Sequence, residues 1–463
     1  MENFTRLRSV GKLEQYSTAR HQIGFYTNVA VTATYVLPES YDRPIKDYVF
    51  RACASLIGEH PVLSAIPVAD DTQEPYFVRL PQIDLDQVVE FTQRSTSPPN
   101  TAPPSHEPAP DQDLQALLQA QHNTPFAAPR AYWRLCVLCN PENDKLFTAS
   151  FVFHHALGDG NSGKAFHRTF LKALSGTPSS GGSTSIIASP QTPLLPNIEA
   201  IHPMPLSFFY LAKKIFQAKV WSPSAPGLWA GSPIRTPLKT RIRLVSLPAG
   251  LLISLRDLCR QEQTTITALL QTVVARSLFV HLPDHFYRLN STGAISARRW
   301  LPDFITDDSM GVFVEGVEDS YLRSDVMTSV GTFPWDEARR SRRTIEAELK
   351  LEGKDTSINL LKYVNDFQQE LCVSKVGQPR DKSFEVSNLG FVPSAMDPEQ
   401  PSIQGMVFSQ CGSVIGNAIM VSAVTGGDGC LNLAVSWQEA SVDEQLVDAF
   451  IRSAADELRR LAE

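Results

Sequence analysis

The sequence predicts an α/β protein, or more broadly an α+β protein, built from two comparable halves. Segments rich in β-branched residues alternate with segments whose apolar residues recur at helical spacing, and stretches rich in serine, glycine and proline separate the halves. The length of 463 residues also exceeds what one hydrophobic core usually supports. We therefore expect an N-terminal domain over residues 1–190, a crossover over 191–240 and a C-terminal domain over 241–463.

The N-terminal half shows a strand, helix, strand order. The segment GFYTNVAVTATYVLP at 24–38 is strand-like, and apolar residues at helical spacing follow in 45–61. Residues 132–141 predict a strand, and the apolar run LFTASFVF at 146–153 predicts a buried one. The next helix is expected to begin near Asn161.

The C-terminal half shows the same mixture of elements. Residues 251–282 indicate two helices, and TTIT at 264–267 offers an N-cap for the second. A strand is expected over 285–295, and two strands joined by a Gly/Asp-rich turn over 416–437. An amphipathic helix over about 442–461 closes the chain.

Four segments between these elements have a special composition. Residues 95–113 are rich in proline and predict a surface loop, whereas 175–193 and 221–237 predict the crossover between domains. Residues 205–221 place phenylalanines near helical spacing among lysines. This pattern allows weak contact with a membrane surface, and the alternative is a helix docked between domains.

Composition and charge exclude several classes of function. The 42 basic and 49 acidic side chains leave a net charge of −7, so we expect no nucleic-acid partner. The N-terminus lacks a secretory apolar run, and no eighteen apolar residues are consecutive, so we expect a cytoplasmic protein that does not span a membrane. We also expect a monomer. The seven cysteines do not form a disulfide framework, and Cys136 and Cys139 lie on opposite faces of a predicted strand, which does not suit zinc.

The segment FTASFVFHHALGDGNSG at 147–163 concentrates the candidate chemistry. Its glycines at 158, 160 and 163 match a dinucleotide loop, but four residues separate the strand from the first glycine and no carboxylate follows about twenty residues later. A nucleophile elbow would need G-x-S-x-G, and around Ser162 the second glycine comes one residue early.

A metal site would draw on His154, His155, Asp159 and His167. Adjacent histidines at the end of a strand point to opposite faces, so they do not readily share one ion, and we expect no metal. The remaining interpretation is that His155 is a general base held at the strand exit, with Asp159 either orienting it or pairing with an arginine. On the residues alone, a histidine satisfied within the core stays an alternative.

The heptapeptide HHALGDG at 154–160 resembles the HHxxxDG signature of the CoA-dependent acyltransferases, which include chloramphenicol acetyltransferase and peptide-synthetase condensation domains. The opening segment at 13–35 is similar to that of fungal alcohol acetyltransferases in particular. Further similar segments follow in order: EHPVLSA at 59–65, ISARRWLP at 295–302 and EVSNLGFV at 385–392. The Asp-Phe-Gly-Trp-Gly motif of the plant enzymes is missing from the chain.

The resemblance implies two chloramphenicol-acetyltransferase-like domains, with mixed sheets flanked by helices and an active-site tunnel between them. It implies that His155 is the general base and that Asp159 has a structural role, paired with Arg298 or, as the second choice, Arg20. His154 would support the strand, and Gly160 would let the loop turn into the helix.

Two further residues are candidates for stabilising an oxyanion. Ser387 and Asn388 lie in the Ser-Asn-Leu-Gly segment, and the alternative is that they only form a turn.

The expected activity is acetyl-CoA-dependent O-acetylation of an alcohol, either a small alcohol or a hydroxylated secondary metabolite. Three alternatives stay open: condensation-type transfer from a carrier protein, N-acylation, and a non-catalytic protein that keeps the tunnel. No carrier domain follows within the 463 residues, and the intact His155 and Asp159 count against a non-catalytic protein.

Overall fold

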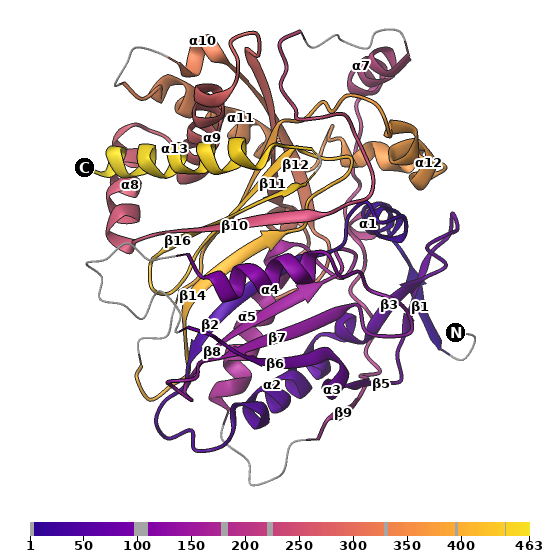
Figure 1. Ribbon diagram of the computed structural model, residues 1–463. Coiled ribbons are helices and arrows are strands. Elements are labelled where there is room, and N and C mark those ends of the chain that lie inside the picture. Colours follow the sequence, from indigo (N-terminus) through magenta and orange to yellow (C-terminus); the bar gives the residue numbers. More distant parts are fainter. Residues whose placement is uncertain are drawn as a thin grey trace.

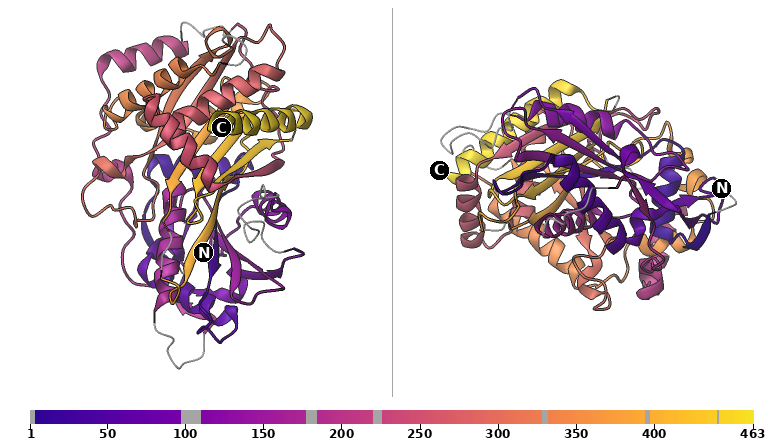
Figure 2. Two further views of the ribbon diagram at one scale, coloured as in Figure 1. Left: turned by 90° about the vertical axis from the view of Figure 1, so that its left-hand side faces the viewer. Right: turned by 90° about the horizontal axis from the view of Figure 1, so that it is seen from below.

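The protein has two lobes, each centred on a mixed β-sheet flanked by helices (Figures 1 and 2). This architecture is seen in a computed structural model that describes residues 4–96, 110–176, 184–219, 226–327, 332–393, 397–439 and 441–463. The predicted fold class is confirmed.

A five-stranded sheet forms the centre of the N-terminal lobe, with the strand order β14-β2-β8-β7-β6. Its strands are β2 (Val29–Val36), β6 (Val89–Gln93), β7 (Trp133–Cys139), β8 (Leu146–Phe153) and β14 (Ser402–Gln410). Strand β8 lies in the middle, antiparallel to both neighbours, and all of its residues are buried. The continuous apolar run in the sequence therefore marks a strand covered on both faces, and the chain leaves it from a fixed position.

Helices and short strands complete this lobe. Helices α2 (Ile45–Glu59) and α5 (Gly160–Ser175) pack on each other, and α5 also packs on β2. The remaining elements are α1 (Lys12–Gln22), α3 (Leu85–Val88), α4 (Gln112–His122), the sheet of β1 (Thr5–Ser9), β4 (Tyr76–Arg79) and β3 (Ala65–Val68), and the pair β5 (Gln82–Asp84) and β9 (Ile186–Ala188).

The C-terminal lobe contains a six-stranded sheet with the order β10-β16-β15-β13-β11-β12. Its strands are β10 (Thr240–Leu247), β11 (Arg288–Ser296), β12 (Val314–Leu322), β13 (Phe384–Phe391), β15 (Ile419–Thr425) and β16 (Leu431–Gln438). Strand β13 is parallel to both of its neighbours, whereas the other pairs are antiparallel. Because side chains alternate along a strand, Phe384 and Val386 enter the helix-covered core, whereas Glu385 and Ser387 face the other lobe.

Helices α8, α9, α10, α11 and α13 cover the sheet face that lies away from the N-terminal lobe. Helix α9 is buried over most of its length between α13, α11 and the sheet. The helices are α6 (Ile198–Ile201), α7 (Phe208–Lys219), α8 (Ala249–Gln261), α9 (Ile266–His281), α10 (Arg323–Val326), α11 (Trp335–Leu349), α12 (Phe367–Leu371) and α13 (Glu444–Ala462).

One strand from the C-terminal half of the sequence belongs to the sheet of the N-terminal lobe. Strand β14 belongs to the C-terminal half of the sequence, but it pairs antiparallel with β2 and closes the edge of the N-terminal sheet (Figure 1). It also contacts β15 and β16. The sheet of the N-terminal lobe therefore includes residues 402–410, which lie outside the range 1–190 predicted for the N-terminal domain.

The strongest sequence patterns match the observed elements. The strands expected within 24–38, 132–141 and 146–153 are β2, β7 and β8, and the two helices expected within 251–282 are α8 and α9. Thr265 is the N-cap of α9, and its side chain accepts a hydrogen bond from the backbone of Ala268. Much of the proline-rich and Ser/Gly-rich linker sequence, at 97–109, 177–183 and 220–225, lies outside the described residues.

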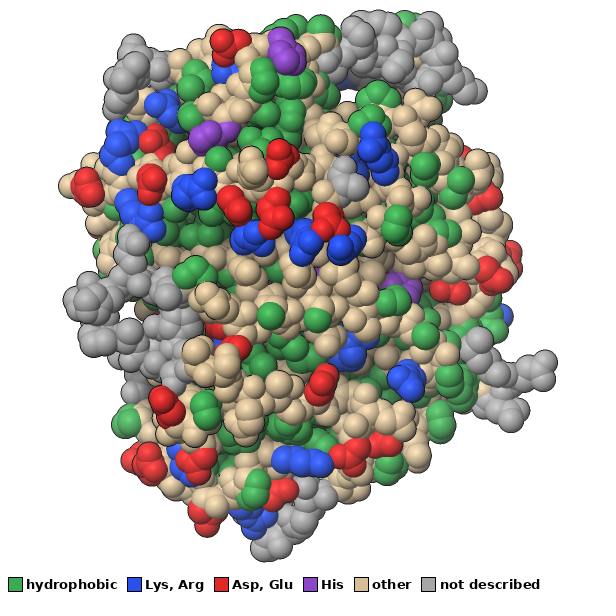
Figure 3. Space-filling view, viewed as in Figure 1, with side chains coloured by type: hydrophobic (Ala, Val, Ile, Leu, Met, Phe, Trp, Pro, Cys, Tyr) green, Lys and Arg blue, Asp and Glu red, His purple; other side chains and the backbone are tan. Residues whose placement is uncertain are grey.

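Helix α7 exposes apolar side chains to solvent. On α7, Phe208 and Phe209 are 78% and 84% exposed, so this helix is not docked between the lobes, and membrane-surface contact stays a prediction. No helix in the described part of the chain is long and apolar enough to cross a membrane. On the face shown in Figure 3, acidic and basic side chains are intermixed, and no single-sign patch dominates.

Candidate active site

The site begins at the turn that joins β8 to α5. The backbone N–H of Ala156 donates to Nδ1 of His154 at 3.0 Å, and the N–H of Leu157 donates to the carbonyl of His154 at 2.9 Å. Asp159 is the N-cap of α5, and its carboxylate accepts from the backbone of Ser162 at 2.9 Å. These local bonds fix the direction in which each motif side chain leaves the turn.

His154 points into the N-terminal lobe. Its ring centroid lies 4.5 Å from that of His21 in an edge-to-face arrangement and 5.3 Å from that of Tyr132. The side chain is 1% exposed, and burial is the main reason that its pKa lies well below the ordinary value. His154 is therefore a neutral packing residue that supports the turn.

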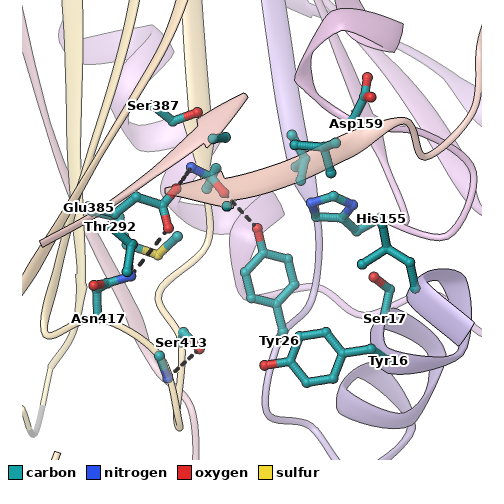
Figure 4. A pocket seen from close by; sticks show the side chains of 18 of the residues that line it. Tyr16, Ser17, Tyr26, His155, Asp159, Thr292, Glu385, Ser387, Ser413 and Asn417 are labelled. Atoms are coloured by element: carbon teal, nitrogen blue, oxygen red, sulfur yellow. Dashed lines mark hydrogen bonds between the residues drawn. The ribbon is translucent and has the colours of Figure 1, made fainter. Parts of the chain in front are cut away.

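His155 points in the opposite direction, into a cavity between the lobes (Figure 4). Its Nδ1 atom is buried and makes no hydrogen bond of good geometry within the described part of the chain, so Nε2 is the nitrogen that reaches the cavity. Burial, followed by the charge of Arg20, lowers the pKa of His155 to about 4, although the nearby carbonyls of His155 and Gly158 act in the other direction. The imidazole is neutral at physiological pH.

The side chain of Asp159 points away from His155, and both of its carboxylate oxygens accept hydrogen bonds. Arg298 donates from Nη1 to Oδ2 at 2.7 Å and from Nη2 to Oδ1 at 3.0 Å, and both side chains are 4% exposed. The hydroxyl of Ser162 and the backbone N–H of Phe313 also donate to this carboxylate. Burial acts to raise the pKa of Asp159, but Arg298 and these donors hold it below the ordinary value. Asp159 is therefore a charged anchor of the turn.

Arg20, the second arginine predicted for this role, lies elsewhere. Its guanidinium lies 4.1 Å from the ring centroid of Tyr16 and 4.4 Å from that of Tyr26, both at the cavity wall. Its charge acts on the pKa of His155 and of Glu385. Arg298, and not Arg20, is the partner of Asp159.

The glycines of the motif provide space for close packing. Neither Gly158 nor Gly160 has a positive φ, so the expected sharp turn at Gly160 is not the reason for glycine there. A Cβ at Gly160 would lie 2.7 Å from a methyl group of Leu389 on the opposite lobe, and one at Gly163 would lie 2.2 Å from a methyl group of Val31. Glycine lets α5 approach both sheets closely, and α5 begins at Gly160 itself.

Two cavities lie between the lobes and meet near His155. The first, here called the histidine cavity, has a volume of about 420 Å³ and contains His155, Arg20 and Glu385 in its wall. The second, here called the lysine cavity, has a volume of about 700 Å³ and contains Lys164 and Arg299. Their walls share Asp159, Gly160, Ala294, Val314 and Ser387. This pair of cavities corresponds in position to the expected tunnel.

The two oxyanion candidates have different surroundings. Ser387 lines both cavities, and its hydroxyl makes no hydrogen bond with any residue that the structure describes. Asn388 lines only the lysine cavity. Its side chain donates to the hydroxyl of Thr267 at 3.1 Å and accepts from the backbone N–H of Gly390 at 2.9 Å. The hydroxyl of Ser387 is therefore free to accept or donate a hydrogen bond in the cavities, whereas the side chain of Asn388 holds the irregular end of β13.

The histidine cavity also contains polar residues that the motif analysis did not single out. The hydroxyl of Tyr26 donates to Oε1 of Gln410 at 3.1 Å, and Nε2 of Gln410 donates to Glu385 at 3.0 Å. Asn417 donates to the other oxygen of Glu385 at 3.2 Å. The alternation of β13 is a signal that could have found Glu385, because it stands two residues from Ser387 on the same face.

The other interpretations of the motif find no support in this geometry. Within the described ranges, no group of three His, Cys, Asp or Glu side chains could hold a metal ion. His167 is separated from His155, because its ring bonds to Tyr35 and to the carbonyl of Val31 in the core. The hydroxyl of Ser162 bonds to Asp159 and to the backbone of Gly311, which is a capping arrangement.

Two lobes enclose a histidine at the end of a buried strand, and the aspartate of the same turn pairs with an arginine of the other lobe. Solved structures of an O-acetyltransferase and of condensation domains have the same two-lobed fold. The chain belongs to the alcohol acetyltransferase family, whose family model matches residues 9–454. The protein is an acyltransferase.

Two relatives are similar over nearly their whole length. The probable alcohol acetyltransferase crmB of Aspergillus fumigatus is 34% identical over 460 residues, which cover 94% of this chain and 96% of crmB. The probable alcohol acetyltransferase FCK4 of Fusarium pseudograminearum is 24% identical over 473 residues, which cover 96% of this chain and 92% of FCK4.

Solved structures share the fold at low sequence identity. The trichothecene 15-O-acetyltransferase TRI3 from Fusarium sporotrichioides superposes with a TM-score of 0.71 at 12% identity, covering 100% of this chain and 98% of TRI3. The condensation domain of the monacolin K polyketide synthase MokA superposes with a TM-score of 0.64 at 11% identity, covering 99% of this chain and 97% of that domain.

Proposed function

We propose that this acyltransferase moves the acetyl group of acetyl-CoA to the oxygen of an alcohol, with His155 as the general base. The observation that carries the proposal is that His155 and Asp159 have different surroundings. His155 reaches the histidine cavity, whereas Asp159 is bound on all sides by Arg298, Ser162 and Phe313. The histidine is then the group of the motif that can exchange a proton with a substrate.

The neutral imidazole accepts the proton of the alcohol at Nε2 as the alcohol oxygen bonds to the thioester carbonyl carbon. Because burial and Arg20 disfavour the charged ring, the imidazolium formed in this way is a strong acid for a histidine. It returns the proton to the sulfur when the carbon–sulfur bond breaks. No covalent enzyme intermediate is needed.

The hydroxyl of Ser387 is the candidate donor to the carbonyl oxygen while that oxygen carries negative charge. Its position at the junction of the two cavities and its lack of a partner among the described side chains support this role. A donor placed in advance stabilises such a charge without reorganisation, and losing one typically costs about 3–4 kcal/mol.

The two cavities suit different substrates. The lysine cavity contains Lys164 and Arg299, whose charges suit the phosphates of coenzyme A, and the hydroxyls of Thr265 and Thr267 add hydrogen-bonding groups. The histidine cavity contains Arg20 and Lys375 but also more carboxylates than the lysine cavity, among them Glu315 and Glu385. We therefore place the acetyl donor in the lysine cavity and the alcohol in the histidine cavity.

Two other acyl-transfer reactions are alternatives that the test below distinguishes. The structural likeness to the MokA condensation domain supports a carrier-protein thioester as an alternative donor, and an amine in place of the alcohol would give N-acylation. A protein that only binds ligands in its cavities is the third alternative.

The test is free-thiol release from acetyl-CoA with a panel of alcohols and amines, for the wild type beside H155A. The control variant is H285A, because His285 is exposed and lies outside both cavity walls. We expect alcohol-dependent release by the wild type and H285A and a loss of about 100-fold or more in H155A. Release by H155A at the wild-type rate would refute the general base, and release only with a carrier-bound thioester or only with amines would favour the alternatives.

A further inference from the structure

Glu385 is a carboxylate in the wall of the histidine cavity that the acetyl-transfer steps above do not use. It lies on β13 two residues from Ser387, and Figure 4 shows both side chains on the cavity face of that strand. Residues i and i+2 of a strand are about 7 Å apart. Glu385 therefore lies within reach of a substrate that reacts beside Ser387 and His155.

The surroundings of Glu385 hold its carboxylate in place with neutral groups. Gln410 and Asn417 each donate one amide hydrogen bond to it, at 3.0 and 3.2 Å, and the carboxylate makes no ion pair with any described residue. Gln410 is itself fixed by the hydroxyls of Tyr26 and Ser422, at 3.1 and 3.3 Å. The hydroxyl of Thr292 is a third donor to this carboxylate. Two ionised oxygens accept up to about four hydrogen bonds, so these three donors leave acceptor capacity toward the cavity.

A buried carboxylate without a cation partner is costly to maintain, and a glutamine would fill the same space. Burial raises the pKa of Glu385, while Gln410, Arg20 and Thr292 act to lower it. A hydrogen-bond donor on the substrate would explain why an acidic group stands at this position. Such a donor completes the hydrogen bonding of the Glu385 carboxylate.

We propose that Glu385 recognises a second hydroxyl group of the acceptor alcohol, several bonds away from the hydroxyl that is acetylated. The proposal rests on the acetyl transfer proposed above and adds the substrate class, which is a diol or polyhydroxylated alcohol. A hydroxyl that donates to a carboxylate forms a short, charge-assisted bond, about twice as strong as a bond between neutral groups.

The charges of the cavity favour a hydroxyl over an ammonium group at this point. The guanidinium of Arg20 lies on the ring of Tyr26, close enough to act on the pKa of both Glu385 and His155. The same cavity wall contains Lys375 and two more acidic side chains, Asp159, which pairs with Arg298, and Glu315, whose pKa burial raises to about 7. A cationic acceptor bound at Glu385 would meet the charge of Arg20 there, whereas a neutral hydroxyl meets no such repulsion.

The experiment compares matched acceptors that differ in one group. We would measure kcat/KM for pentane-1,5-diol, pentan-1-ol and 5-aminopentan-1-ol with the wild type and E385Q, and check the fold of each protein by thermal unfolding. In the wild type we expect the diol to exceed the monoalcohol by about 10-fold or more. In E385Q we expect that ratio to fall to within about 2-fold of unity.

Several results would overturn the proposal. They are a wild-type diol ratio near unity, an unchanged ratio in E385Q, and a wild-type preference for the amino alcohol. The wild-type ratio is decisive even if E385Q fails to fold. If the wild type transfers acetyl to no alcohol, the function proposed above fails, and binding of the diol and the monoalcohol, measured by ligand-observed NMR, still tests recognition by Glu385. Equal binding of the two would then overturn it.

Discussion

Nη1 of Arg298 lies 2.7 Å from Oδ2 of Asp159, and this buried ion pair joins the first turn of α5 in one lobe to the turn after β11 in the other. The pair does two things at once. It fixes the loop that carries His155, and it fixes the distance between the lobes whose facing surfaces form the two cavities. This ion pair, which the proposed acetyl transfer does not use, thus holds the walls of both cavities in position.

The first prediction concerns this pair. D159N leaves Arg298 buried without a counter-charge, which typically costs about 3–5 kcal/mol of the free energy of unfolding. We expect a lower unfolding midpoint in urea and a lower kcat/KM for acetyl transfer. D308N is the matched control, because Asp308 pairs with Arg168 on the surface, where an ion pair contributes about 0–1 kcal/mol. Loss of activity in D159N with unchanged stability would indicate a direct chemical part for Asp159.

The second prediction uses two glycines that both lie in helices. A Cβ at Gly163 would lie 2.7 Å from Cβ of Val31, which cannot move without the backbone of β2. Gly58 of α2 has nothing within 4 Å of its added Cβ. We expect G163A to lower the free energy of unfolding by about 1–3 kcal/mol, and G58A to raise it by up to about 1 kcal/mol. The combination V31A/G163A should lose less than the sum of the single changes. Equal shifts in G163A and G58A would contradict the close approach.

Sequence patterns predicted the local elements and the motif well, because both depend on nearby residues. The run 146–153 has the composition of a buried strand, and Thr265 caps α9 by a bond within its own turn. The sequence assigns different roles to His155 and Asp159 only through the resemblance to known acyltransferases. Local patterns could not do so, because Arg298, the partner of Asp159, lies 139 positions away.

Long-range pairing was not predictable in this way. The segment SIQGMVFSQ of β14 is strand-like, but nothing within it specifies β2 as its neighbour. The glycines of the motif are a second case, because the reason for them is the position of Val31 and Leu389 on other strands. Glu385 is a case of the opposite kind, since strand alternation alone places it beside Ser387.

The third prediction separates the two candidates in the Ser-Asn-Leu-Gly segment. S387A removes the hydroxyl at the junction of the cavities, and we expect kcat to fall by about 100- to 1,000-fold with KM nearly unchanged, because the lost contact is made in the transition state. N388A removes the bonds to Thr267 and Gly390, so we expect a lower unfolding temperature and a much smaller change in kcat. S387A with a kcat within about 3-fold of the wild type would exclude the serine as the donor to the oxyanion.

The fourth prediction concerns pH and the charge of Arg20. Because burial and Arg20 lower the pKa of His155 to about 4, the neutral base is present throughout the ordinary titration range of histidine. We expect kcat/KM to stay level through pH 6.5 and to fall only as the pH approaches about 4. Removing a cation near an imidazolium stabilises the protonated ring, so R20M should move this acidic limb to higher pH, while burial keeps it below 6.5.

R260M is the control for net charge, because Arg260 is exposed on α8 and pairs with Asp257. Circular dichroism at each pH separates titration of the base from acid unfolding. A wild-type limb near pH 6.5, or a shift to lower pH in R20M, would contradict the assignment of His155 as a base whose pKa is set by burial first and by Arg20 second.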